Sequence, residues 1–113
     1  MISVKISFEN GDWERGFDLV LEDLKARPDR QRRSVVLSAQ GIGGGFTYEF
    51  SKASQNHQEA FGDPLKVLFS MGVPFVSSAG NAAGGDGKKD RIDTLPGTLA
   101  DKELPIITVG AAT

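Results

Sequence analysis

The chain has 113 residues, of which 39% are apolar and 25% charged, and its net charge is −2. These values are typical of one soluble globular domain, and we expect a single domain over residues 1–113. The absence of cysteine excludes disulfides, thiol nucleophiles and cysteine-ligated zinc, and a single histidine, His57, excludes sites built from several histidines. No apolar run is long enough to span a membrane, and the slightly acidic charge does not favour nucleic acid as a partner.

The first third of the chain has the pattern of a strand, a helix and a second strand. Apolar and polar residues alternate over residues 2–8, which predicts a strand with one buried face. Asp12 is a suitable N-cap for a helix whose apolar residues recur at helical spacing until Pro28 ends it. Residues 34–39 form a continuous apolar, β-branched run, the pattern of a strand covered on both faces of a parallel sheet.

The middle of the chain begins with a glycine-rich loop at residues 41–45. The polar stretch 47–62 is only weakly periodic, and we expect it to be irregular or partly helical. Asp63 is predicted to cap a short helix that has Pro64 at its first position and Gly72 just past its end.

Two further buried strands are predicted at residues 73–79 and 106–111, separated by a long loop at 80–97. The element order indicates a three-layer α/β arrangement with a mostly parallel sheet. Ligands bind such sheets at the loops that follow the carboxyl ends of strands. The glycine-rich loops after Ala39 and Ala79 lie at such ends, so they are the candidate binding region.

Neither glycine-rich loop matches a phosphate-binding motif. The third glycine of a dinucleotide motif would fall at Phe46, and a Walker loop would need serine or threonine at Lys89. The aspartates between residues 86 and 93 lack the spacing of a calcium loop. We therefore expect no cofactor and no metal, and a nucleotide-binding domain is the weakest of the functional alternatives.

Two other features have structural interpretations. The basic stretch 27–33 could form a patch for nucleic acid or an acidic surface, but no aromatic residues interleave with its arginines, which favours a solvated connection. His57 lies among polar residues, and Trp13 begins an amphipathic helix. We expect His57 to have no catalytic role, and we expect Trp13 to be a packing residue.

The segment from Ser77 to Asn81 is the most informative one. Small residues end a buried strand and place the Asn81 amide at the rim of the sheet, where it could donate a hydrogen bond to an oxyanion. The alternative is an asparagine in a left-handed turn after a strand. The spacing alone favours that turn.

Several segments resemble, in the same order, the subtilisin-like serine peptidases, the subtilase family. Residues 34–41 resemble the family's V-x-N-M-S-L-G strand end, and residues 64–81 resemble the helix and strand that end in A-A-G-N. Pro96 and residues 105–111 resemble the following Y-P-A and I-x-V-G-A segments, and residues 26–33 are similar in style to fungal members. The resemblance covers most of the chain and implies a subtilisin-like fold.

The resemblance also implies roles for particular residues. Asn81 would occupy the oxyanion-hole position. One wall of the substrate cleft, with backbone that pairs with an extended substrate, would consist of Ser38, Ala39, Gln40 and Gly41. The other wall, beside the primary specificity pocket, would consist of Ser78, Ala79 and Gly80.

The family's catalytic motifs are absent from the chain. No D-T-G, H-G-T or G-T-S-M-A motif occurs, and His57 is not followed by Gly-Thr. A hydrolytic triad needs a nucleophile, a base and an orienting acid in contact, so we expect no activity from this chain alone. The resemblance implies the central fragment, or a truncated derivative, of a subtilisin-like endopeptidase. The alternative is a non-enzymatic interaction module that binds a peptide or protein in the cleft, or pairs as a homodimer through open sheet edges.

Overall fold

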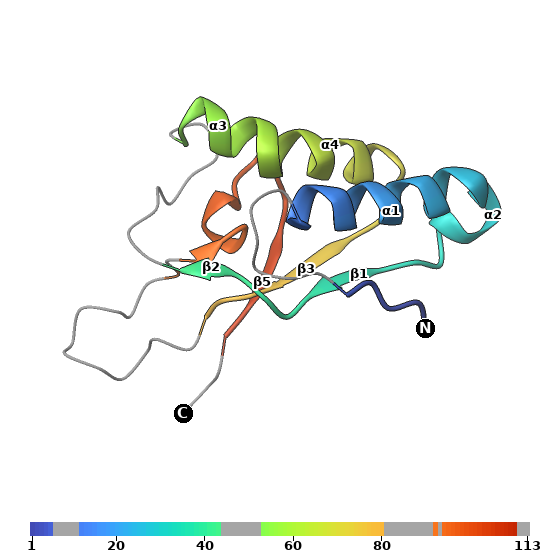
Figure 1. Ribbon diagram of the computed structural model, residues 1–113, viewed down its shortest axis with the longest axis horizontal. Coiled ribbons are helices and arrows are strands. Elements are labelled where there is room, and N and C mark those ends of the chain that lie inside the picture. Colours follow the sequence, from blue (N-terminus) through green and yellow to red (C-terminus); the bar gives the residue numbers. More distant parts are fainter. Residues whose placement is uncertain (6–11, 44–52, 81–91, 93, 111–113) are drawn as a thin grey trace.

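A three-stranded parallel sheet forms the centre of the fold in the computed structural model, which describes residues 1–5, 12–43, 53–80, 92 and 94–110. The strands β1 (Val36–Ser38), β3 (Phe75–Ser78) and β5 (Ile107–Val109) lie in the order β1-β3-β5 (Figure 1). β3 is parallel to both of its neighbours. Three of the four predicted strands are therefore confirmed as parallel strands, and each is shorter than predicted.

The predicted amphipathic helix is confirmed as α1 (Asp12–Ala26). Asp12 is its first helical residue rather than the residue before it, a difference of one position. Phe17, Leu21 and Leu24 are buried on one side, which is the stripe that the helical spacing predicts. The helix ends before Pro28, and that proline begins the short helix α2 (Pro28–Gln31).

A second helical rod crosses the same side of the sheet. It consists of α3 (Gln55–His57), the π-helical turn η2 (Gln58–Gly62) and α4 (Asp63–Ser70), which follow one another without a break. The rod begins at Ser54, whose hydroxyl oxygen accepts a hydrogen bond from the backbone N–H of His57 at 3.3 Å. The expectation that residues 47–62 are partly helical is therefore confirmed for residues 55–62.

The prediction that Asp63 caps a new helix is wrong, because the helical rod begins at Gln55, with Ser54 as its N-cap, and continues through this position. The N–H of Asp63 donates to the carbonyl of Gln58, five residues earlier, as in a π turn. Pro64 has no N–H, and its ring would clash with a carbonyl of an ordinary α-helical turn, so a wider turn accommodates it. The helix end is as predicted, with Gly72 at a φ of 74°.

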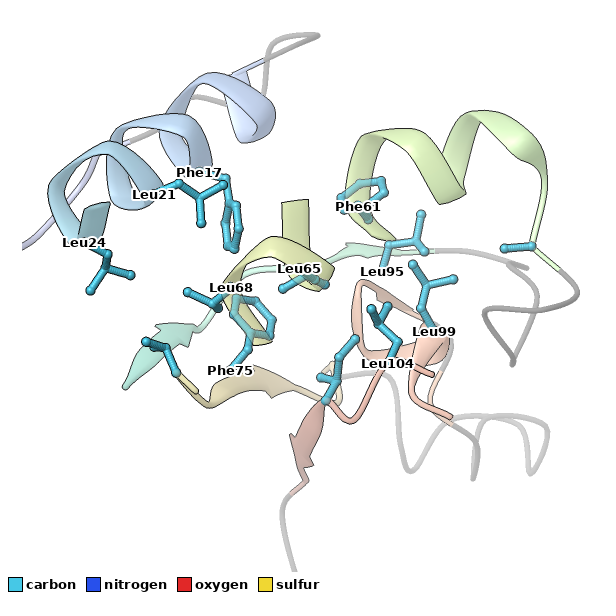
Figure 2. Close-up of a cluster of buried hydrophobic side chains, with 13 residues drawn as sticks. Phe17, Leu21, Leu24, Phe61, Leu65, Leu68, Phe75, Leu95, Leu99 and Leu104 are labelled. Carbon is cyan, nitrogen blue, oxygen red and sulfur yellow. The ribbon is translucent and has the colours of Figure 1, made fainter. Parts of the chain in front are cut away.

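Both α1 and α4 lie on the same face of the sheet (Figure 1). The buried side chains between these helices and the sheet form one cluster, which is shown in Figure 2. The cluster contains Phe17, Leu21, Leu24, Ala53, Phe61, Leu65, Leu68, Val73, Phe75, Leu95, Leu99, Leu104 and Ile106. The cluster consists of aliphatic and aromatic side chains, as expected for a helix layer on a sheet, and the buried polar side chains of the described residues are those of Ser77, Thr94 and Thr98.

The opposite face of the sheet is exposed. Leu37 of β1 is 71% exposed, and Ile107 of β5 is 52% exposed. The prediction that residues 34–39 are covered on both faces is therefore wrong, since only the helix side of β1 is packed. Among the described residues the fold is mixed α/β with two layers, and the three-layer arrangement stays a prediction.

The N-terminal segment is not the predicted strand in the part that the structure describes. Residues 1–5 have no strand hydrogen bonding, and Ile2 is 65% exposed. The rest of the predicted strand lies outside the described residues. Alternation shows that a segment can form a strand, but a strand also needs hydrogen bonds to a neighbouring strand, and residues 1–5 form no such ladder.

Part of the predicted loops is ordered as a small second sheet. β2 (Ile42–Gly43) pairs antiparallel with β4 (Thr94–Leu95), which is followed by the 3₁₀ turn η3 (Gly97–Leu99). These two-residue strands are too short to give a visible alternation in the sequence. No helix of the described part is long and apolar enough to cross a membrane.

Candidate functional site

The carboxyl ends of β1 and β3 bring the two predicted cleft walls together. The strands pair Ser38 with Ser77, so the segments that follow them leave the sheet side by side. A Cβ atom on Gly41 would lie 2.9 Å from Cβ of Thr94, and one on Gly80 would lie 2.8 Å from Cγ2 of Thr94. Gly41 and Gly80, one from each predicted wall, therefore both pack against Thr94. The contact is so close that a Cβ atom at either position would clash.

The second wall is also held against the far strand. The backbone N–H of Ala79 donates to the carbonyl of Val109 at 2.9 Å, and Gly80 has a φ of 90°, which favours glycine. Ser78, Ala79 and Gly80 are half-buried. Small residues at this position keep the ends of the strands close together.

The serine hydroxyls at these strand ends are hydrogen-bonded to the backbone. The Ser38 hydroxyl donates to the carbonyl of Gln40 at 3.1 Å, and the Ser77 hydroxyl donates to the carbonyl of Ser78 at 3.3 Å. A serine nucleophile instead needs a base within hydrogen-bond reach of its hydroxyl. The described strand ends thus contain no serine paired with a base.

His57 lies in the helical layer. Its ring packs edge-on against Phe61, with ring centroids 6.4 Å apart, and it belongs to α3 rather than to a strand end. This placement agrees with the structural interpretation of the histidine. Among the residues that the structure describes, no group of three or more metal-ligating side chains occurs.

A groove with a volume of about 500 Å³ runs along β1. One side is the face of α1 that carries Trp13, Phe17 and Val20, and the other consists of residues 3–5. The floor is residues 36–40, so the groove includes Ser38, Ala39 and Gln40 of the first predicted wall.

Trp13 has the packing role that its position predicts, and it also lines the groove. Its ring stacks on Phe17, with centroids 4.8 Å apart and planes 8° from parallel, and it lies 4.7 Å from the ring of Phe61. Sequence reasoning missed the second role because the groove forms only when α1 packs beside β1. Thr94 was missed for a similar reason, since it belongs to a predicted loop.

The outer edge of β1 carries the backbone groups of Leu37, a residue that also lines the groove. The N–H of Val36 donates to the carbonyl of Pro74 at 2.9 Å, toward the sheet interior. Alternate residues of a strand point their backbone groups in opposite directions, so the N–H and carbonyl of Leu37 point to the outer edge. Among the described residues β1 pairs only with β3, and this edge is open.

Asn81, the predicted oxyanion donor, lies outside the described residues. The structure places the seven other predicted site residues at the two neighbouring strand ends, and their roles stay predictions. No family model, curated protein or solved structure matches this chain. The functional argument therefore rests on the groove, the open edge and the strand ends.

Proposed function

We propose that this chain is the central part of a subtilisin-like peptidase domain, as a fragment or truncated derivative, which binds an extended peptide segment and does not cut it alone. The observation that carries the proposal is the groove beside β1, whose lining includes Ser38, Ala39 and Gln40 of the first predicted wall. The three-layer subtilisin-like fold is part of the same proposal.

The peptide would bind as an added strand. Its backbone would pair with the N–H and carbonyl of Leu37, which gives affinity without regard to sequence. Alternate side chains of the peptide would point toward Trp13, Phe17 and Val20, which favours apolar residues at every second position. The preferred ligand is therefore an extended segment of alternating apolar and polar residues.

The strand ends would receive the segment where it leaves the groove. Gly41 and Gly80 both pack on Thr94, which holds the two strand ends together where the segment would pass. In the proposal, Asn81 would donate a hydrogen bond to a carbonyl oxygen of the bound segment. Without a nucleophile and a base, this arrangement binds the segment and leaves its peptide bonds intact.

The alternative is a non-enzymatic interaction module derived from the same family. The hydrogen bonds of the Ser38 and Ser77 hydroxyls to backbone carbonyls favour it, because they assign these groups to structure. The two functions share the groove and differ in whether the missing catalytic segments, supplied on another chain, restore hydrolysis. Restored hydrolysis would support the fragment, and binding without hydrolysis would support the module.

The test uses the fluorescence of Trp13, which is the only tryptophan of the chain and lines the groove. Titration with an extended peptide of alternating valine and serine should give a saturable change in its emission. Leu37→Pro removes the outward N–H and should weaken binding at least about tenfold, since one backbone hydrogen bond and the fit of the added strand are lost. Leu37→Ala keeps that N–H and should bind nearly as well as the natural chain.

An emission spectrum that does not change with peptide, or equal binding by the two Leu37 variants, would falsify the proposal of strand addition. The absence of catalysis is tested separately, with a fluorogenic peptide and a serine-phosphonylating reagent. We expect neither turnover nor labelling. Turnover of the peptide, or labelling by the reagent, would contradict the proposal that the chain does not cut.

A further inference from the structure

Residues 2–5 lie beside the groove without being part of the sheet. Residues 3–5 line the groove together with residues 36–40, and residues 1–5 form no strand hydrogen bonds. Ile2 is 65% exposed and Val4 is 37% exposed, so both aliphatic side chains are in contact with water. We call residues 2–5 the strap.

The topology of the sheet favours a position for the strap at the outer edge of β1. A crossover between neighbouring parallel strands is right-handed in almost all proteins. Because α1 and α4 lie on the same face of the sheet, the crossovers through these two helices move across the sheet in the same direction (Figure 1). The crossover through α4 moves from β1 to β3, so a strand that precedes α1 belongs on the other side of β1, which is the outer edge.

The strap also has the length and the pattern of a strand for this edge. Four residues of extended chain span about 13 Å, and the three residues of β1 span about 10 Å. The two aliphatic side chains of the strap alternate with Ser3 and Lys5, so one face of the extended strap is apolar and the other is polar. The apolar face can pack on the side of the groove that α1 forms. This is the same alternation that the proposed function assigns to the peptide.

Docking of the strap on this edge is expected to be reversible. It buries the side chains of Ile2 and Val4 and pairs the backbone groups of Leu37, which favours the docked state. It also orders the backbone of four residues, and the entropy that is lost opposes docking by a similar amount. A peptide with the same alternation can therefore displace the strap.

We propose that the strap docks on the outer edge of β1 as a fourth parallel strand and competes there with the peptide. The N–H of Leu37 donates to a backbone carbonyl of the docked strap, in the place that the peptide backbone takes when it binds. The docked strap closes the site, and the undocked strap, which the structure describes, leaves it open. The competition rests on the proposed peptide binding, whereas the docking itself does not.

Amide hydrogen exchange, measured residue by residue by NMR, tests docking without any peptide. Val4→Ser makes the strap polar and should keep it undocked. The Leu37 amide should then exchange at least about threefold faster than in the natural chain, because the docked strap no longer protects it. The Val36 amide donates to the carbonyl of Pro74 within the sheet, so its exchange should not change.

Val67 on α4 provides the matched control. Its side chain is 37% exposed, like that of Val4, and it does not line the groove. Val67→Ser should therefore leave the exchange of the Leu37 amide as it is in the natural chain. Circular dichroism checks that both variants fold.

The fluorescence of Trp13 tests the competition. Val4→Ser should bind the peptide of alternating valine and serine more tightly than the natural chain does. The gain in affinity should equal the factor by which the Leu37 amide exchanges faster, since both measurements report the fraction of molecules whose edge is free. Val67→Ser should bind the peptide as the natural chain does.

The outcomes separate the strap from the proposed function. Equal exchange of the Leu37 amide in Val4→Ser and in the natural chain would overturn the proposal, whatever the peptide does. Weaker peptide binding by Val4→Ser would also overturn it, because residues 3–5 would then be a wall of the groove that holds the peptide. Faster exchange without peptide binding by any variant would uphold docking of the strap and contradict the proposed function.

Discussion

The two faces of the parallel sheet use nearly the same kinds of residues and have opposite surroundings. Ile106 lies in the core and is 8% exposed, whereas the next residue, Ile107, is 52% exposed. α1 and α4 cover only the first of these faces. A strand whose residues are apolar on both sides is therefore not evidence that its own domain covers both sides. The pattern shows that both faces are apolar, and it does not show what packs against each of them.

The largest expected difference between the two faces is in the free energy of unfolding. Ile106→Ala removes packed methylene groups from the core and should lower the stability by about 3 kcal/mol. Ile107→Ala removes the same atoms from an exposed position and should cost less than about 1 kcal/mol. Urea unfolding of both variants measures the difference. Equal losses would mean that Ile107 is packed as tightly as Ile106.

The next largest loss of stability is expected from substitutions at the carboxyl ends of the strands. Gly80→Ala adds a methyl group 2.8 Å from Cγ2 of Thr94 at a positive φ, and should cost about 2 kcal/mol. Gly72→Ala has a similar φ and nothing within 4 Å, so it should cost only about 1 kcal/mol. Thermal or urea unfolding compares the two.

The difference between these glycine variants reports the contact with Thr94. Adding Thr94→Ser to Gly80→Ala removes the clashing Cγ2 methyl group and should recover part of the lost stability. Adding it to Gly72→Ala should recover none. A double variant no more stable than additivity predicts would show that the walls are not packed on Thr94.

A smaller change, an increase in stability, is expected from a substitution of the buried Thr98. The Thr98 side chain in η3 is buried, and its hydroxyl has no hydrogen-bond partner in the described structure. Thr98→Val keeps the shape and removes the unpaired hydroxyl, so it should raise the stability by about 1 kcal/mol. The denaturation midpoint is the measurement. A decrease would show that this hydroxyl is hydrogen-bonded.

The smallest effect is expected on the outer surface of the helix layer. Asp23 on α1 and Arg27, the residue just past the end of this helix, form a partly exposed ion pair with Oδ1 and Nη2 at 3.3 Å. Asp23→Asn should change the stability by less than about 0.5 kcal/mol, and added salt should reduce the change further. A larger loss would mean that the outer surface of α1 is covered.

The sequence predicted those elements whose signals are local. The spacing of Phe17, Leu21 and Leu24 predicted α1, and the β-branched runs predicted β1, β3 and β5. Gly72 predicted the end of α4 because a positive φ at that position favours glycine. The carboxyl ends of parallel strands lie at the same edge of a sheet. The two candidate walls, which follow β1 and β3, therefore lie side by side.

The features that sequence reasoning missed depend on contacts between distant segments. Asp63 and Pro64 have the residue types of a helix start, but the preceding turn widens and the helix passes through them. The groove depends on how closely Trp13 approaches β1. The exposure of Leu37 depends on which helices pack on the sheet. The apolar sequence around Leu37 would be the same if that face were covered.

The pairing of the strands also has a consequence for the order of folding. Val36 pairs with Phe75, and Val76 pairs with Ile107, so each pair of central strands joins segments far apart in the chain. Closing such long loops costs entropy before the first strand hydrogen bonds form, whereas α1 and the rod from α3 to α4 form from local contacts. We therefore expect the helices to form before the strands pair, and the assembly of the sheet beneath them to be the slow step of folding.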